Sequence, residues 1–145
     1  MKLRFEPNLQ FQLDAIEAVC DLFKGQESCR SVFTVSIPTE EQTDYLLESE
    51  AMGIGNKLAL LEDEILANLK DVQLRNGLRP DETLQSMDFT VEMETGTGKT
   101  YVYLRTILEL NKRFGFNKFV IVVPSIAIKE GVYKSLQITQ EHFRS

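Results

Sequence analysis

The chain has 145 residues, 43% of them hydrophobic, and a formal net charge of −6. This length suits one domain with a buried core. No apolar run approaches the roughly 20 residues of a membrane-spanning helix, and the first residues lack the apolar centre of a signal peptide. The sequence therefore predicts a soluble, cytoplasmic protein and argues against a membrane protein.

The charge is unevenly distributed along the chain. Residues 26–87 hold 12 acidic and 5 basic side chains, whereas residues 99–145 hold 8 basic and 3 acidic ones. The last third is therefore suited to face a polyanion, although the chain as a whole is acidic. Cys20 and Cys29 form no C-x-x-C pair and there is a single histidine, so reduced thiols are favoured over a metal site. The acidic run 62–64 is interpreted as a solvated helix face.

Hydrophobic periodicity predicts two helices before residue 78. The first is expected from about residue 9 to residue 24, with Asn8 as its N-cap and Gly25 as its stop. The second lies within residues 56–77. Between them, residues 31–37 alternate as in a short strand and the remainder is interpreted as a loop. The periodic apolar residues are Leu9, Leu13, Ile16, Cys20 and Phe23 in the first helix, and Leu58, Leu61, Ile65, Leu69 and Val72 in the second.

The last part of the chain has an α/β pattern. Residues 89–93 alternate as a short strand, and a helix is expected from about Gly98 to Arg113. Residues 118–124 (KFVIVVP) form a β-branched run, which predicts a strand buried on both faces. Another helix is expected over residues 126–139. Strand, helix and parallel strand make a right-handed βαβ unit, so the predicted fold class is α/β, with a parallel sheet and flanking helices.

A glycine loop, TGTGKT, joins the first of these strands to its helix at residues 95–100. Gly96 and Gly98 let backbone N–H groups approach phosphate oxygens, and the helix N-terminus adds its dipole. Lys99 is expected to reach the β- and γ-phosphates, and the Thr100 hydroxyl to bind Mg²⁺. Because the turn lacks G-x-G-x-x-G, a triphosphate is favoured over a dinucleotide. The simpler alternative is an ordinary glycine-rich turn.

Three segments, in order, resemble motifs of superfamily 2 helicases and translocases, above all the motor (Res) subunits of type III restriction-modification enzymes. VEMETGTGKT is similar to motif I, in which the first loop position is often not glycine, so Met93 fits the pattern. NLQFQLDAIEAV resembles the upstream glutamine motif, and VIVVPSIAIKEGVYKSL resembles motif Ia. The resemblance implies a partial RecA-like P-loop motor domain.

The resemblance also implies roles for single residues. Gln12 would read the adenine edge, which implies ATP as the nucleotide, and Phe5 or Phe11 would stack on the base. Ser125 would hold a DNA phosphate, with Lys129 or Lys134 adding charge. The nucleotide-binding set implied is Gln12, Thr95, Gly96, Thr97, Gly98, Lys99 and Thr100, of which Lys99 and Thr100 are the catalytic pair and Thr100 the Mg²⁺ contact.

The chain divides accordingly into three parts. Residues 1–25 form a glutamine-motif helix, residues 26–87 an acidic inserted segment of mixed structure, and residues 88–145 the P-loop βαβ part of the first motor domain. Family members continue with an Asp-Glu motif, and no such pair follows Lys99. We therefore expect a piece truncated before that motif, which alone binds ATP weakly, hydrolyses it negligibly, and is marginally stable or oligomeric.

The function implied is that of the ATP-binding N-terminal part of a DNA translocase or helicase. Its parent would be a prokaryotic, ATP-dependent type III site-specific deoxyribonuclease, the endonuclease of a restriction system. The implied partners are the double-stranded DNA backbone and the modification (methyltransferase) subunit, with no membrane. Whether this chain alone is an enzyme stays open. The alternatives are another superfamily 2 DNA helicase, a type I restriction motor, a P-loop kinase, or a non-hydrolysing nucleotide-binding remnant.

Overall fold

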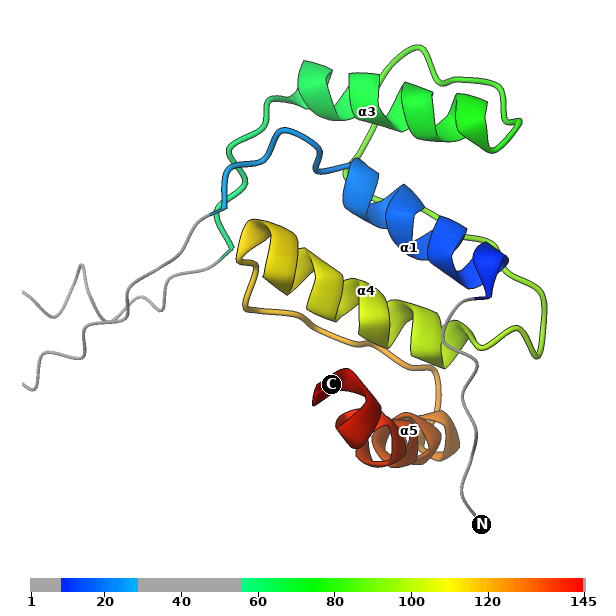
Figure 1. Ribbon diagram of the computed structural model, residues 1–145. Helices are drawn as coiled ribbons and strands as arrows, with labels where there is room; N and C mark the ends of the chain where they lie inside the picture. The colour runs from blue at the N-terminus through cyan, green and yellow to red at the C-terminus, as the bar shows by residue number, and fades with distance from the viewer. Residues whose placement is uncertain (1–8, 29–55, 145) are drawn as a thin grey trace, which may run out of the picture.

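The computed structural model of the chain describes residues 9–28 and 56–144. Within these ranges the chain forms four helices, which stack in the order α3, α1, α4 and α5 (Figure 1). Their bounds are Gln10–Asp21 for α1, Glu62–Arg75 for α3, Lys99–Phe114 for α4 and Ile126–Arg144 for α5. No helix in the described ranges is long and apolar enough to cross a membrane.

The core lies between α1 and α4. Ile16 and Cys20, one turn apart on α1, meet Val102 and Leu110 of α4, and all four are buried. Phe116, just beyond α4, closes the cluster and packs edge-on against the ring of Phe23 at 5.4 Å between centroids. The helical period predicted for residues 9–24 therefore does face a core. The helix itself ends earlier, at Asp21, and a turn follows to Gly25.

Helix α4 matches its predicted span closely. It begins after Gly98 and ends before Gly115, both of which have positive φ values of 86° and 74°. Glycine adopts this left-handed conformation without the steric cost that a Cβ brings, so these two residues fix both ends of the helix. At the C-terminal end the Asn111 side chain donates a hydrogen bond to the Phe116 carbonyl (2.7 Å), which turns the chain back toward the core.

Helix α3 is shorter than predicted. It begins at Glu62, where Glu64 Oε2 accepts a hydrogen bond from the Leu61 N–H (2.8 Å). Leu58 and Leu61, which we placed on its apolar face, lie before the helix and are exposed. The acidic first turn and its cap determine the start, because negative side chains stabilise the positive end of a helix. Ile65 is the fully buried residue of α3.

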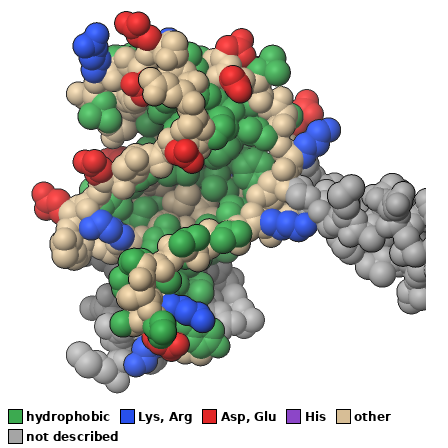
Figure 2. Space-filling model, turned by 180° about the vertical axis from the view of Figure 1, so that it is seen from behind, with side chains coloured by type: hydrophobic (Ala, Val, Ile, Leu, Met, Phe, Trp, Pro, Cys, Tyr) green, Lys and Arg blue, Asp and Glu red, His purple; other side chains and the backbone are tan. Residues whose placement is uncertain are grey.

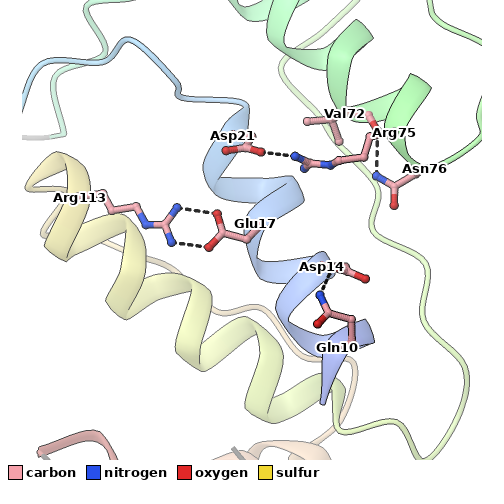
Figure 3. Close-up of polar contacts among 8 residues, drawn as sticks. All are labelled: Gln10, Asp14, Glu17, Asp21, Val72, Arg75, Asn76 and Arg113. Carbon is pink, nitrogen blue, oxygen red and sulfur yellow. Dashed lines mark hydrogen bonds and ion pairs between the residues drawn. The ribbon is translucent and has the colours of Figure 1, made fainter. Parts of the chain in front are cut away.

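Two side chains attach α3 to the end of α1. Asn68 donates hydrogen bonds to the carbonyls of Leu22 (3.1 Å) and Lys24 (2.9 Å), which are among the groups left without helical partners where α1 ends. Arg75 forms an ion pair with Asp21 at 2.6 Å (Figure 3). The described part of the acidic segment thus packs on α1.

The predicted parallel sheet is wrong for this structure, since the described residues contain helices and no strand. Residues 117–123 form an unpaired segment, with Val120 89% and Val122 87% exposed. Residues 88–94 likewise pair with no neighbour (Figure 1). A β-branched run favours extended backbone, but a strand also needs a ladder partner and cover for its faces. The α/β, RecA-like fold class is accordingly corrected to a helical arrangement over residues 9–28 and 56–144.

In place of a neighbouring strand, a single side chain holds the beginning of the 117–123 segment. Asn56 Oδ1 accepts hydrogen bonds from the N–H groups of Asn117 (2.9 Å) and Lys118 (3.1 Å), and its Nδ2 donates to the Lys118 carbonyl (2.7 Å). Helix α5 follows over Ile126–Arg144, longer than the predicted 126–139, and buries Val132. The strand predicted at 31–37 and the N-cap at Asn8 lie outside the described residues.

Candidate nucleotide-binding site

The glycine loop leads directly into the N-terminus of α4. Gly96 and Gly98 have φ values of 83° and 86°, so both predicted loop glycines adopt the conformation that a tight backbone turn demands. No side chain caps the N-terminus of α4 by a hydrogen bond. This end of the helix carries N–H groups without intrahelical acceptors and the positive end of the dipole, the two features that attract anions.

One backbone carbonyl of the loop accepts hydrogen bonds from two side chains. Lys99 Nζ donates to the Glu94 carbonyl at 2.9 Å, and Thr97 Oγ1 donates to the same oxygen at 2.7 Å. The Lys99 side chain is therefore folded back across the loop, although it is exposed. Thr95 is also exposed, whereas Thr100 in the first turn of α4 is half-buried. The predicted loop residues thus share one small surface.

Gln12 contacts the loop from α1. Its side chain is 7% exposed, and its Nε2 donates a hydrogen bond to the Thr97 carbonyl at 2.8 Å. A Cβ placed on Gly98 would lie only 2.7 Å from the same Nε2. The structure therefore brings Gln12, one of the residues in the implied nucleotide-binding set, to the loop from 85 positions away in the chain. Its direct partner here is the loop backbone.

The predicted DNA-contact residues lie at the start of α5. Ser125 Oγ accepts a hydrogen bond from the Ile128 N–H at 3.3 Å, as an N-cap does, and the Ser125 carbonyl accepts from the Lys129 N–H at 3.1 Å. Lys129 and Lys134 are exposed on this helix. No hydrogen bond or ion pair joins Ser125 to the glycine loop among the described residues. Phe5 lies outside the described residues.

An ion pair joins α1 to α4. The Arg113 guanidinium donates two hydrogen bonds to the Glu17 carboxylate, at 2.6 and 2.8 Å (Figure 3). Its Nε also donates a hydrogen bond to Glu109 at 3.1 Å. The hydrogen bond from Arg113 holds the pKa of Glu17 below its usual range. Sequence reasoning missed this pair, although its charges stand on the two helices that the apolar pattern predicted. The apolar pattern does not show how the two helices are placed relative to each other, so it could not predict which charged residues would meet.

The buried thiol of Cys20 is not a candidate nucleophile. Burial raises its pKa to about 11, so it is protonated near neutral pH, and a thiol reacts as its thiolate. The described residues contain no cluster of three or more His, Cys, Asp or Glu side chains that could hold a metal ion. What the site can do chemically therefore depends on the loop, Lys99, Thr100 and Gln12.

A glycine loop that leads into a helix, with a lysine and a threonine as the first helical residues, is similar to the loops that bind phosphate groups in other proteins. Comparison with known proteins is more specific. Residues 9–144 match the model of the family described as type III restriction enzyme, res subunit. The chain belongs to this family.

Individual relatives agree. The chain is 37% identical over 145 residues to the EcoPI Res subunit of a type III restriction-modification enzyme from Escherichia phage P1, and 36% identical over 146 residues to the EcoP15I Res subunit from Escherichia coli. These alignments cover 97% and 96% of this chain but 14% and 13% of the relatives. A third relative, the StyLTI Res subunit from Salmonella typhimurium, is 53% identical over 55 residues, or 37% of this chain and 6% of its own length.

Proposed function

We propose that this chain is the nucleotide-binding portion of an ATP-dependent DNA motor in a type III restriction enzyme. The observation that carries the proposal is the contact of Gln12 with the glycine loop: a buried amide bonds to the carbonyl of Thr97 while Gly96 and Gly98 turn the backbone toward the uncapped end of α4. A helix N-terminus and a loop of left-handed glycines suit a polyphosphate, because both present N–H groups to an anion.

The residues present fit such a group. Lys99 is the closest cation to the loop backbone, and its long side chain would exchange the Glu94 carbonyl for a phosphate oxygen. The Thr100 hydroxyl, in the first turn of α4, would hold Mg²⁺, while Thr95 and Thr97 form the wall of the loop. Bound Mg²⁺ would supply charge neutralisation on the phosphates.

Gln12 would serve the loop and the base together. Its Nε2 has two N–H bonds, one of which is directed at the Thr97 carbonyl. The other N–H and the amide oxygen keep the donor and acceptor that pair with an adenine edge. Phe11, the residue before Gln12 on α1, is 47% exposed and would stack on the base. Gln12 would thus contact the base and the loop backbone at the same time. ATP is the nucleotide expected.

The parent protein's activity is proposed on the family membership. The curated relatives are Res subunits of type III restriction-modification enzymes, of which this chain spans about one seventh. In such a protein the loop would drive translocation on double-stranded DNA in the cytoplasm of a prokaryote, beside a modification subunit and a nuclease activity. Ser125 and Lys129 would contact the DNA backbone, because a helix N-terminus and a lysine read phosphate rather than sequence.

Nucleotide binding is tested by titrating the 145-residue chain with a fluorescent ATP analogue, with and without Mg²⁺. We expect weak binding that Lys99→Ala reduces by about tenfold or more, since a charge-assisted hydrogen bond is lost. Lys112→Ala, an exposed lysine in the last turn of the same helix, is the matched control and should bind as the unmodified chain does. Equal affinity of the two variants, or no binding at millimolar nucleotide, would contradict the proposal.

Turnover and DNA binding separate the finer parts of the proposal. No Asp-Glu pair follows Lys99 in these residues, so phosphate release by this chain alone should stay at background, and motor-like turnover sensitive to Lys99→Ala would overturn that expectation. For DNA, fluorescence anisotropy with a random duplex should show binding that weakens as salt rises. Lys129→Ala should reduce it, whereas Lys70→Ala on α3 should not.

A further inference from the structure

A wide groove lies on the side of α1 that faces α3 and the segment following α3. Its volume is about 1200 Å³, above the range of roughly 300–1,000 Å³ that is usual for small-molecule sites. Figure 2 shows hydrophobic side chains gathered in a hollow of the face seen from behind. The groove is lined by Ala15, Ala18 and Val19 of α1, by Leu69 and Val72 of α3, and by Phe89 in the segment beyond.

The charged residues that line this groove all have one sign. Five carboxylates line it and no lysine or arginine does, within the described residues. None of the five forms an ion pair with a described residue, since the ion pairs there involve Asp21, Glu17 and Glu109. Two of them accept hydrogen bonds from neutral amides only. The five are Asp14, Asp81, Asp88, Glu92 and Glu94.

We propose that this groove is the docking surface for a cationic amphipathic helix of a protein partner. The apolar floor would take the hydrophobic face of the helix, and the carboxylates its lysines and arginines. Ala15 and Ala18 are half-buried residues of α1 that line the groove, and their small side chains allow an incoming helix to approach to the usual 8–10 Å between axes. One end of the groove adjoins the glycine loop, since Glu94 and Thr97 line both, but the proposal does not rest on nucleotide binding.

The same charges disfavour other occupants. A nucleic acid would bring phosphates against five carboxylates, which repel it. A second copy of this chain carries a net charge of −6, so long-range repulsion opposes its approach. A partner with basic and apolar side chains at helical spacing satisfies both the floor and the rim.

The test uses the 145-residue chain and a labelled synthetic peptide that forms a helix with leucines on one face and lysines on the other. A matched peptide carries glutamate in place of each lysine. Fluorescence anisotropy should show binding of the lysine peptide, weakening with salt, and none of the glutamate peptide. Asp88→Lys combined with Glu92→Lys reverses two exposed groove charges and should weaken binding by about tenfold or more, because each reversed charge turns an attraction for the peptide's lysines into a repulsion.

The matched control is Glu62→Lys combined with Asp63→Lys. These side chains are exposed at the start of α3, do not line the groove, and change the net charge equally. Circular dichroism checks that both variants stay folded. If both variants lost peptide binding equally, net charge alone would explain the loss and the proposal would be wrong. It would also be overturned by equal binding of the glutamate peptide, binding of duplex DNA that the groove variant alters, or sedimentation showing that the groove variant abolishes self-association.

Discussion

Replacing Gly98 by alanine probes the junction between the glycine loop and α1. The residue has a φ of 86°, and the added Cβ would lie 2.7 Å from Gln12 Nε2, closer than real Cβ contacts come. Gly96 offers a matched comparison. Its φ is 83°, but a Cβ there would meet nothing within 4 Å. The two substitutions therefore share their backbone strain and differ in the contact with Gln12.

The size of each effect follows from this difference. A left-handed conformation costs a non-glycine residue about 1–2 kcal/mol, and both variants should lose this much stability. Gly98→Ala must also displace the buried Gln12 amide from the Thr97 carbonyl, which adds about 1 kcal/mol for a lost hydrogen bond. We expect a free energy of unfolding lower by about 2–3 kcal/mol for Gly98→Ala.

Urea denaturation followed by circular dichroism measures both variants, alone and combined with Gln12→Ala. Without the Gln12 amide, Gly98→Ala should cost no more than Gly96→Ala, because the group that the Cβ displaces is gone. A double-mutant cycle therefore isolates the contact, with a coupling of about 1 kcal/mol. If the two glycine substitutions cost the same in the presence of Gln12, or if their difference survives its removal, the geometry assigned to this junction is wrong.

Two further predictions concern an ion pair and a buried thiol on α1. Arg113→Met removes the double hydrogen bond to Glu17, but because both side chains are at least a third exposed we expect a loss of only about 1 kcal/mol; Arg75→Met, a single and more exposed pair, should cost less. The pKa of Glu17 is lowered from 4.5 in the folded chain. The difference in free energy of unfolding between the unmodified chain and Arg113→Met should therefore be complete above pH 4.5 and shrink as the pH falls below it. Urea midpoints at several pH values would show this. In a Cys29→Ser background, Cys20 should resist a thiol reagent until urea unfolds the chain, and stability should fall as the pH rises from 9 toward 11, the unfolded and folded pKa values of this thiol; rapid labelling of the folded chain would contradict its burial.

The helices and the loop could be predicted from the sequence because local signals specify them. The 3.6-residue period identified α1, and two glycines marked the start and end of α4 to within about one residue. The string TGTGKT carries its own geometry, since left-handed glycines and a following helix leave the backbone few alternatives. Family resemblance placed Gln12 in the same nucleotide-binding set as the loop, but its hydrogen bond to the Thr97 carbonyl was not predicted, because nothing local indicates a partner 85 positions away.

Strand pairing could not be predicted in this way. Residues 117–123 have the composition of a buried strand, yet Val120 and Val122 are almost fully exposed. Composition determines the extended backbone, whereas pairing depends on what lies beside it, and here the Asn56 side chain satisfies the first backbone groups. The predicted start of α3 was wrong for a related reason. The apolar spacing continued back to Leu58, but the Glu64 cap and the acidic first turn placed the start at Glu62.

Helix α1 is the element that connects the loop to the rest of the described chain. Near its start Gln12 bonds to Thr97, and in its middle Glu17 bonds to Arg113 in the last turn of α4, so α4 is attached to α1 at both ends. The C-terminal end of α1 is attached to α3 through Asp21 and Asn68. A ligand that moves the loop backbone must therefore strain the Gln12 contact or move α1 with it. Helix α1 also forms one wall of the acidic groove, and Glu94 and Thr97 of the loop line it as well, so the loop and the groove are in direct contact.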